Sequence, residues 1–187
     1  MITTSYFVWA ELKSELFSNL YIKIHEYLKK NNIENIISFQ NILSLHITFY
    51  YFENWINLKS QKNIKNFINN INLDFDIFID SFKYFWSNKE KRIWYFYWKS
   101  EVDLLWIRNN FHNHFKMINV DDNNLEFIPH ITFLRILDST IYENYKIDIE
   151  NIISWELTKI KEKNIFTHKI FLYKVNSSFP WQIQIKI

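Results

Sequence analysis

The sequence predicts an α+β fold in which antiparallel strands and helices follow one another in a mixed order. Some segments alternate apolar and polar residues with the two-residue period of a half-buried strand, and others repeat apolar residues every three or four positions, as helices do. Leu73–Phe85 and Arg92–Trp98 are strand-like and are joined by the polar stretch Ser87–Lys91, which is typical of an antiparallel hairpin. The tetrapeptide His-Ile-Thr-Phe occurs twice, at His46–Phe49 and His130–Phe133, which suggests an internal duplication.

The remaining elements follow from the same two periods. Lysines lie opposite the apolar residues of the first helix, and Asp103 is expected to cap the third. Strands are predicted at Tyr6–Leu12, Leu43–Phe52, Leu73–Phe85, Arg92–Trp98, Ile128–Leu137, Trp155–Lys161, Phe166–Val175 and Gln182–Ile187. Helices are predicted at Lys13–Asn31, Leu58–Ile71, Asp103–Ile118 and Tyr145–Ile153. This mixture is typical of the α+β class.

No segment rich in glycine, proline or serine divides the chain. The asparagine-rich stretches Asn31–Asn35 and Asn119–Asn124 are interpreted as loops. A length of 187 residues suits one compact domain. We therefore expect residues 1–187 to form a single domain with two lobes.

Composition excludes several classes of function. There are no cysteines, so disulfides, thiolate zinc sites and cysteine nucleophiles are excluded. The net charge of +2 is too small to predict nucleic-acid binding by itself. No signal peptide or membrane-spanning apolar stretch is visible. We expect a cytoplasmic protein with no membrane partner.

The chain has no glycine and eight tryptophans, whereas average usage would give about 13 glycines. Trp55, Trp86 and Trp181 stand where turn glycines are expected. One explanation is an AT-rich genome that avoids glycine codons, which fits the single alanine, Ala10. The other is that UGA codons read as glycine in the source were translated as tryptophan. UGG codons at these positions would exclude the second explanation.

The repeated tetrapeptide has the pattern of a catalytic strand. Residues i and i+2 of a strand face the same side, about 6.6 Å apart. His46 and Thr48 should therefore share one face, as should His130 and Thr132, while the intervening isoleucine and phenylalanine pack into a core. A single copy is more often structural, but two copies in so short a chain favour function.

Such a pair suits cleavage of a phosphodiester without a metal. One group must take a proton from the attacking water, and another must give a proton to the leaving oxygen on the opposite side of phosphorus. Histidine, with a pKa of about 6.5, suits both tasks. Two threonine hydroxyls can donate hydrogen bonds to the non-bridging oxygens.

The other histidines show no comparable pattern. His25 is expected to be exposed on a helix, and His168 begins a strand. His112 and His114 are two residues apart on a predicted helix, so they should not share a face. No cluster has the spacing of zinc ligands, and we expect no metal site.

These residues resemble the 2H phosphoesterase superfamily, which is named for two His-x-Thr/Ser-x motifs. Within it they are most similar to the RNA 2',3'-cyclic phosphodiesterases, also called 2'-5' RNA ligases. The resemblance also covers Tyr6–Leu12, Tyr50–Phe52, Pro129, Leu134–Arg135 and Lys169–Lys174, and so extends over essentially the whole chain. Family glycines after the first motif and near Trp86 and Trp181 are absent here, so the loops around the cleft are expected to differ if these tryptophans are genuine.

The resemblance implies a duplicated, two-lobed fold with antiparallel sheets lining a central cleft and helices outside. It implies metal-independent, cofactor-free hydrolysis of RNA 2',3'-cyclic phosphate ends to 2'-phosphate. His46 would be the proton donor and His130 the proton acceptor, while Thr48 and Thr132 would hold the phosphate.

The rim of the site is less defined. Arg135 could add positive charge, although a surface arginine is an equal alternative. Three aromatic residues are candidates for stacking on a base, although such residues more often belong to the core: Phe39, Tyr51 and Trp86. We expect the partner to be RNA or a nucleotide with a cyclic phosphate, bound by a monomer.

Two other functions stay open. The same tetrad could cleave cyclic or 2'-5' linked nucleotide signals, including an anti-defence role, or the chain could be an RNA-binding module without activity. Intact histidine and threonine at all four positions argue against the last.

Overall fold

The computed structural model describes residues 3–12, 15–52, 56–71, 75–86, 92–100, 102–117, 128, 130–161, 165–178 and 181–186. Its strands are β1 (Thr3–Leu12), β2 (Ile37–Phe39), β3 (His46–Phe52), β4 (Phe75–Trp86), β5 (Arg92–Lys99), β6 (His130–Ile136), β7 (Ile165–Ser178) and β8 (Trp181–Lys186). Its α-helices are α1 (Ser18–Lys30), α2 (Leu58–Asn69), α3 (Leu104–Met117) and α4 (Ser139–Ile160), and a 3-10 turn, η3 (Ile42–Ser44), precedes β3. Trp55, Pro129, Ser87–Lys91 and Asn119–Asn124 lie outside the described residues, as do the side chains of Trp86, His168 and Trp181.

The strands form two antiparallel four-stranded sheets. The first has the order β3-β1-β7-β8, and the second has the order β2-β6-β5-β4. Phe75–Ile77, at the start of β4, pairs with Ile165–Thr167 of β7 and so joins the two sheets. The α+β prediction and the two-lobed arrangement are confirmed.

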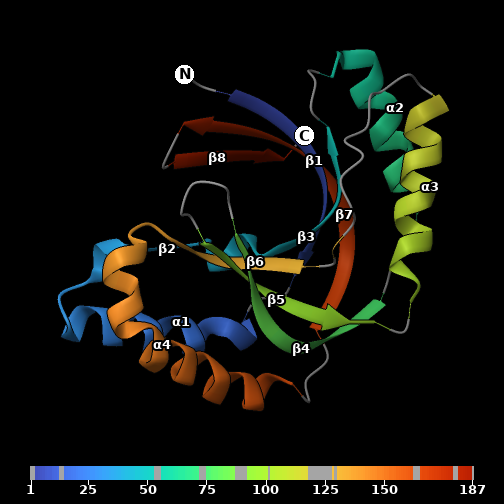
Figure 1. The fold of residues 1–187 in the computed structure, drawn as a ribbon. Coiled ribbons are helices and arrows are strands. Elements are labelled where there is room, and N and C mark those ends of the chain that lie inside the picture. Colours follow the sequence, from blue (N-terminus) through green and yellow to red (C-terminus); the bar gives the residue numbers. More distant parts are fainter. Residues whose placement is uncertain are drawn as a thin grey trace.

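Each sheet is covered by a pair of helices. α2 contacts β7 and α3 contacts β3 on the first sheet, whereas α1 and α4 pack together beside the second. Figure 1 shows the two helix pairs on different sides of the strands. The side chain of Asp103 accepts a hydrogen bond from the backbone N–H of Trp106 at 3.0 Å, which is the predicted cap of α3. Among the described helices, none is both long and apolar enough to cross a bilayer.

The predicted strand at Trp155–Lys161 is wrong, because these residues continue α4. Apolar side chains that recur every three or four positions are buried along this helix: Ile149, Ile153, Leu157 and Ile160. The helix also begins earlier than predicted, where the side chain of Asp138 accepts a hydrogen bond from the N–H of Ile141 at 2.9 Å. Sequence periodicity also missed β2, which has only three residues.

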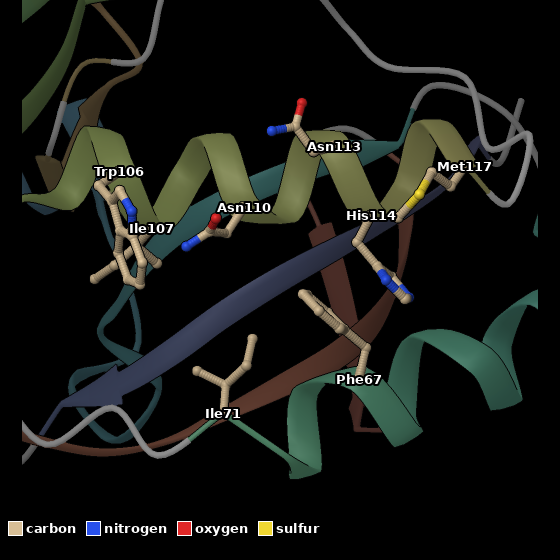
Figure 2. A pocket seen from close by; sticks show the side chains of 8 residues that line it. All are labelled: Phe67, Ile71, Trp106, Ile107, Asn110, Asn113, His114 and Met117. Carbon is tan, nitrogen blue, oxygen red and sulfur yellow. The ribbon is translucent and has the colours of Figure 1, made fainter.

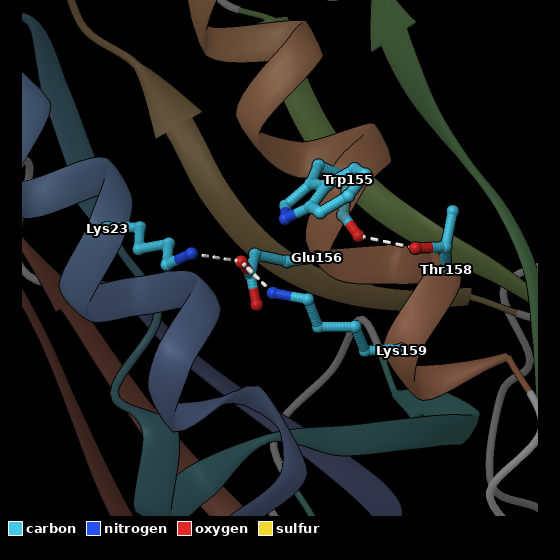
Figure 3. Close-up of polar contacts among 5 residues, drawn as sticks. All are labelled: Lys23, Trp155, Glu156, Thr158 and Lys159. Atoms are coloured by element: carbon cyan, nitrogen blue, oxygen red, sulfur yellow. Dashed lines mark hydrogen bonds and ion pairs between the residues drawn. The ribbon is translucent and has the colours of Figure 1, made fainter.

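A buried carboxylate ties α1 to α4. Glu156 of α4 is 3% exposed, and its Oε1 lies 2.6 Å from Nζ of Lys23 on α1 and 2.8 Å from Nζ of Lys159. Figure 3 shows both lysines converging on this oxygen. Burial raises the pKa of Glu156, but the hydrogen bonds from Lys159 and Lys23 outweigh it and hold the pKa below its usual value.

The described tryptophans lie in regular elements. Among the described residues only Asn32 has a positive φ, at 55°. No described tryptophan therefore has a backbone conformation that favours glycine. The indole N–H groups of Trp9, Trp94 and Trp98 are buried without a hydrogen-bond partner among the described residues, which costs about 1–3 kcal/mol each. The codons at these positions decide between tryptophan and glycine.

Candidate active site

The two copies of His-Ile-Thr-Phe begin two strands, β3 and β6, that show the same pattern of burial along all seven residues. In each strand the isoleucine and phenylalanine are buried, and the histidine and threonine are half-buried on the opposite side. Phe133 stacks on Phe96 at 4.1 Å between ring centroids, and Phe49 contacts Phe111 of α3 at 6.0 Å. Each copy therefore anchors one face in the core and presents a hydroxyl and an imidazole on the other.

Both motif strands contain a bulge at the same position. The residues on either side of Phe49 pair with consecutive residues of β1, and those on either side of Phe133 pair with consecutive residues of β5. An extra residue in one strand reverses the alternation that follows it. The next side chain on the histidine face is therefore Tyr51 in β3 and Arg135 in β6. We call this side of each sheet its motif face.

The two histidines have equivalent hydrogen bonds. Nδ1 of His46 lies 2.8 Å from the carbonyl oxygen of Ser44, and Nδ1 of His130 lies 2.7 Å from that of Ile128. A carbonyl oxygen only accepts, so Nδ1 carries the proton in both rings. This bond fixes the tautomer and leaves Nε2 of each ring as the atom available to a substrate.

The structure brings the two motifs together. β3 and β6 lie close to each other although they belong to different sheets. The pKa of His46 is lowered to about 4, chiefly by burial and in smaller part by electrostatic interaction with His130 and Arg135, while the bond to Ser44 acts in the opposite direction. Burial also lowers the pKa of His130. Both histidines are therefore neutral at pH 7 before a substrate binds.

Aromatic rings fix each imidazole from the neighbouring strand. The indole of Trp9 on β1 stacks on the ring of His46, with centroids 3.6 Å apart and planes at 16°. Trp9 also stacks on Tyr173 of β7, with ring centroids 4.4 Å apart. Tyr95, at the equivalent place on β5, meets His130 edge-on at 5.5 Å. Sequence analysis missed both contacts because they depend on the pairing of distant strands.

A chain of polar contacts connects Arg135 to the first motif. Its Nη1 donates to Oε1 of the buried Gln40 at 3.2 Å, and Nε2 of Gln40 donates to Oγ of Ser44 at 3.3 Å. Ser44 is also the residue whose carbonyl oxygen holds His46. No motif in the sequence marked Gln40, which acts as a bridge between the two halves of the site.

The candidate stacking residues separate into two groups. Tyr51 lies on the motif face, where its ring is 4.8 Å from that of Phe7. Phe39 pairs with Leu134 on the other face of the second sheet and contacts Tyr21 of α1 at 5.1 Å. The structure therefore brings Tyr51, but not Phe39, to the face of the histidines. The side chain of Trp86 is outside the described residues.

A separate groove of about 360 Å³ lies between α2 and α3. Figure 2 shows His114 directed at Phe67, on which it stacks at 3.7 Å. Burial lowers the pKa of His114. Within the described ranges, no group of three or more His, Asp or Glu residues could hold a metal ion.

Three solved structures share this architecture. Escherichia coli LigT complexed with 3'-AMP matches with a TM-score of 0.62 and 12% identity, over 98% of this chain and 95% of LigT. A phosphoesterase matches with a TM-score of 0.61 and 13% identity, over 98% and 95% of the two chains. A Thermus thermophilus protein matches at 0.62 and 13%, over 98% and 94%. This chain has the 2H phosphoesterase fold.

No protein-family model and no curated protein matches this sequence. At identities of 12–13%, what this chain shares with these three structures is the fold. It is the 2H phosphoesterase fold that the resemblance of the two motifs implied. In this chain the two motif strands occupy equivalent positions in the two sheets, as the matching bulges and histidine hydrogen bonds show.

Proposed function

We propose that this protein hydrolyses 2',3'-cyclic phosphate ends of RNA to 2'-phosphates without a metal ion. One observation carries the proposal: the two lobes present the same histidine and threonine, with the same fixed tautomer, on neighbouring strands of one 2H phosphoesterase fold. His46, His130, Thr48 and Thr132 are the proposed catalytic residues. This set supports the proposal, since hydrolysis of a phosphodiester without a metal needs two proton-transfer groups and fixed donors to the phosphate oxygens.

The reaction can be written with all protons assigned. Nε2 of His130 takes a proton from water as the water oxygen bonds to phosphorus. The bond from phosphorus to the ribose 3' oxygen breaks, and Nε2 of His46 gives this oxygen its proton. The product carries a 2'-phosphate and a 3'-hydroxyl, and proton exchange with solvent restores both histidines. Thr48 and Thr132 donate hydrogen bonds to the non-bridging oxygens.

The pKa of His46 sets a condition on this assignment. A donor must hold a proton, yet burial, with smaller contributions from His130 and Arg135, lowers the pKa of His46 to about 4 in the free protein. A bound phosphate places negative charge beside the ring and raises its pKa. The donor role of His46 therefore depends on the substrate, and we expect kcat/KM to peak below pH 7.

Arg135 and Tyr51 make the two flanks of the site chemically different. They occupy equivalent positions after the two bulges, so a cation lies on one flank of the phosphate and an aromatic ring on the other. We propose that Arg135 contacts the phosphate and that Tyr51 lies beside the nucleoside. This difference between the lobes would orient a substrate in an otherwise symmetric site.

Hydrolysis of 2',3'-cyclic AMP and of cyclic-ended RNA in EDTA tests the proposal. We expect turnover without added metal, and a loss of about 10²–10⁴-fold in His46→Ala and in His130→Ala, which is what general acid–base catalysis contributes. His25→Ala is the matched control, because His25 is exposed on α1. Loss of wild-type activity on chelation, or near-normal rates in either motif variant, would remove the mechanism. Cyclic dinucleotides and 2'-5' oligomers in the same panel test the signalling alternative.

A further inference from the structure

A second cluster of apolar side chains lies outside the main core, on the motif face of the first sheet. Its buried members are Trp9, Tyr173 and Val175, and Phe7 and Phe171 are half-buried against them. Apolar residues on this face contribute nothing to the core between sheet and helices. Their position next to His46 therefore needs another explanation.

Strand register places these rings in a row that starts at the site. Tyr51 of β3 is paired with Phe7 of β1, Phe7 with Tyr173 of β7, and Tyr173 with Lys186 of β8. Neighbouring strands are about 4.8 Å apart, so the row extends about 14 Å from Tyr51 to Lys186. Phe171 is two residues before Tyr173 and lies on the same face. We call these five residues the aromatic track.

We propose that the aromatic track binds the nucleotides that precede the cyclic-ended nucleotide, so that the preferred substrate is a single-stranded oligonucleotide and not a mononucleotide. This inference rests on the proposed function. A 2',3'-cyclic phosphate can lie only on the last nucleotide, so the rest of the RNA must leave the site on its 5' side. Rows of aromatic rings beside positive charge bind single strands in many proteins, because every base can stack on a ring.

The charges at the far end of the track suit the RNA backbone. Nζ of Lys186 lies 3.0 Å from the centroid of Phe171 and 3.3 Å from Oε2 of Glu11. Glu11 also accepts a hydrogen bond from the hydroxyl of Tyr173. Lys186, Phe171 and Lys65 line one notch of about 310 Å³ beside β7. Lys186 supplies the positive charge at this end of the track that a phosphate contact requires.

The second sheet offers a weaker alternative. Lys83 lies over the ring of Tyr97 at 3.9 Å on the motif face of β4 and β5. The neighbouring ring of Tyr95 faces His130 edge-on, and Arg135 already supplies the charge on this flank. The row on the first sheet has more rings and ends at Lys186, so we assign the RNA to it.

The test compares 2',3'-cyclic AMP with a cyclic-ended adenosine pentanucleotide. Stacking on one aromatic residue accounts for about 1–3 kcal/mol, so Phe171→Ala should lower kcat/KM for the pentanucleotide about tenfold and leave cyclic AMP within twofold. Phe171→Leu keeps an apolar side chain and should lose as much, because the flat ring is missing. The slope of the logarithm of the pentanucleotide binding constant against the logarithm of the salt concentration should become about 0.7 less steep in Lys186→Ala. Lys186→Arg should have the wild-type slope.

Lys174→Ala is the matched control. Lys174 is on β7 next to Tyr173 but faces the opposite side of the sheet, so its loss removes the same charge without touching the track. Equal losses on both substrates, no loss on the pentanucleotide, or a length-dependent loss in Lys83→Ala instead would overturn the inference.

Binding separates this inference from the proposed function. Fluorescence anisotropy with a labelled pentanucleotide carrying a 3'-phosphate needs no turnover. If the wild type hydrolyses neither substrate, the proposed function fails, while a tenfold weaker binding of the Phe171 and Lys186 variants would still support the track. If these variants bind as the wild type does, the track is refuted whatever the activity.

Discussion

Replacing Trp9 should raise the pKa of His46. The indole covers one face of the imidazole at 3.6 Å, and burial is the main cause of the low pKa of His46, about 4 against an ordinary 6.5. At 1.36 kcal/mol per pKa unit, this difference corresponds to about 3.4 kcal/mol. Trp9 covers one of two ring faces, so we expect Trp9→Ala to raise the pKa by about one unit.

The shift also predicts how stability depends on pH. The unfolded chain binds a proton on His46 at a higher pH than the folded chain does. The free energy of unfolding is therefore unaffected by His46 above about pH 6.5 and decreases as the pH falls from 6.5 towards 4. Trp9→Ala should flatten this acidic limb in urea unfolding experiments, even though removal of a buried tryptophan lowers stability by about 3–5 kcal/mol overall.

Titration of His46 by NMR measures the pKa in the folded state directly. Trp9→Phe retains a stacked ring and should leave the pKa near that of the wild type. Trp155→Ala, which removes an exposed tryptophan from α4, is the matched control. A wild-type His46 that titrates near pH 6.5, or equal values in all variants, would refute the link between the indole and the imidazole.

Two further predictions concern residues that bridge parts of the molecule. Gln40→Leu removes the acceptor of Arg135 and the donor to Ser44, so kcat/KM should fall about tenfold, mainly through a higher KM. Gln40→Glu should keep most of the activity. Unchanged kinetics in Gln40→Leu would contradict the role of Gln40 as a bridge. Glu156→Gln removes the charge that holds Lys23 and Lys159 and should cost about 1 kcal/mol at pH 7 by urea unfolding. Because the pKa of Glu156 is lowered in the folded chain, this difference should be complete above pH 4.5 and should decline as the pH falls below that value towards the folded-state pKa. A difference that does not decline in acid would argue against an ionic origin.

The motif strands could be predicted from the sequence because their signal is local. Alternation placed the histidine and threonine of each copy on one face, and identical copies implied equivalent positions. The helical extent of α4 was missed because the segment around Trp155 also alternates over a few residues. Its buried residues at every third or fourth position are recognisable only over a longer window.

The rest of the site depends on contacts between distant residues. Tyr51 and Arg135 become equivalent only through a bulge, and a bulge is a property of two paired strands. Gln40 and Trp9 reach the histidines through strand pairing that no single segment encodes. Phe39 and Tyr51 looked alike in the sequence, and only the register separates their faces.

The strand β4 limits how the two lobes can move. Its first three residues hydrogen-bond to the first sheet, and its later residues hydrogen-bond to the second, with a register shift between Ile79 and Ser81. Hinge motions in proteins concentrate in loops or element ends, and here the connection is a paired strand. The lobes therefore cannot swing apart like two domains on a linker. We therefore expect the distance between the two histidines to change little when a substrate binds.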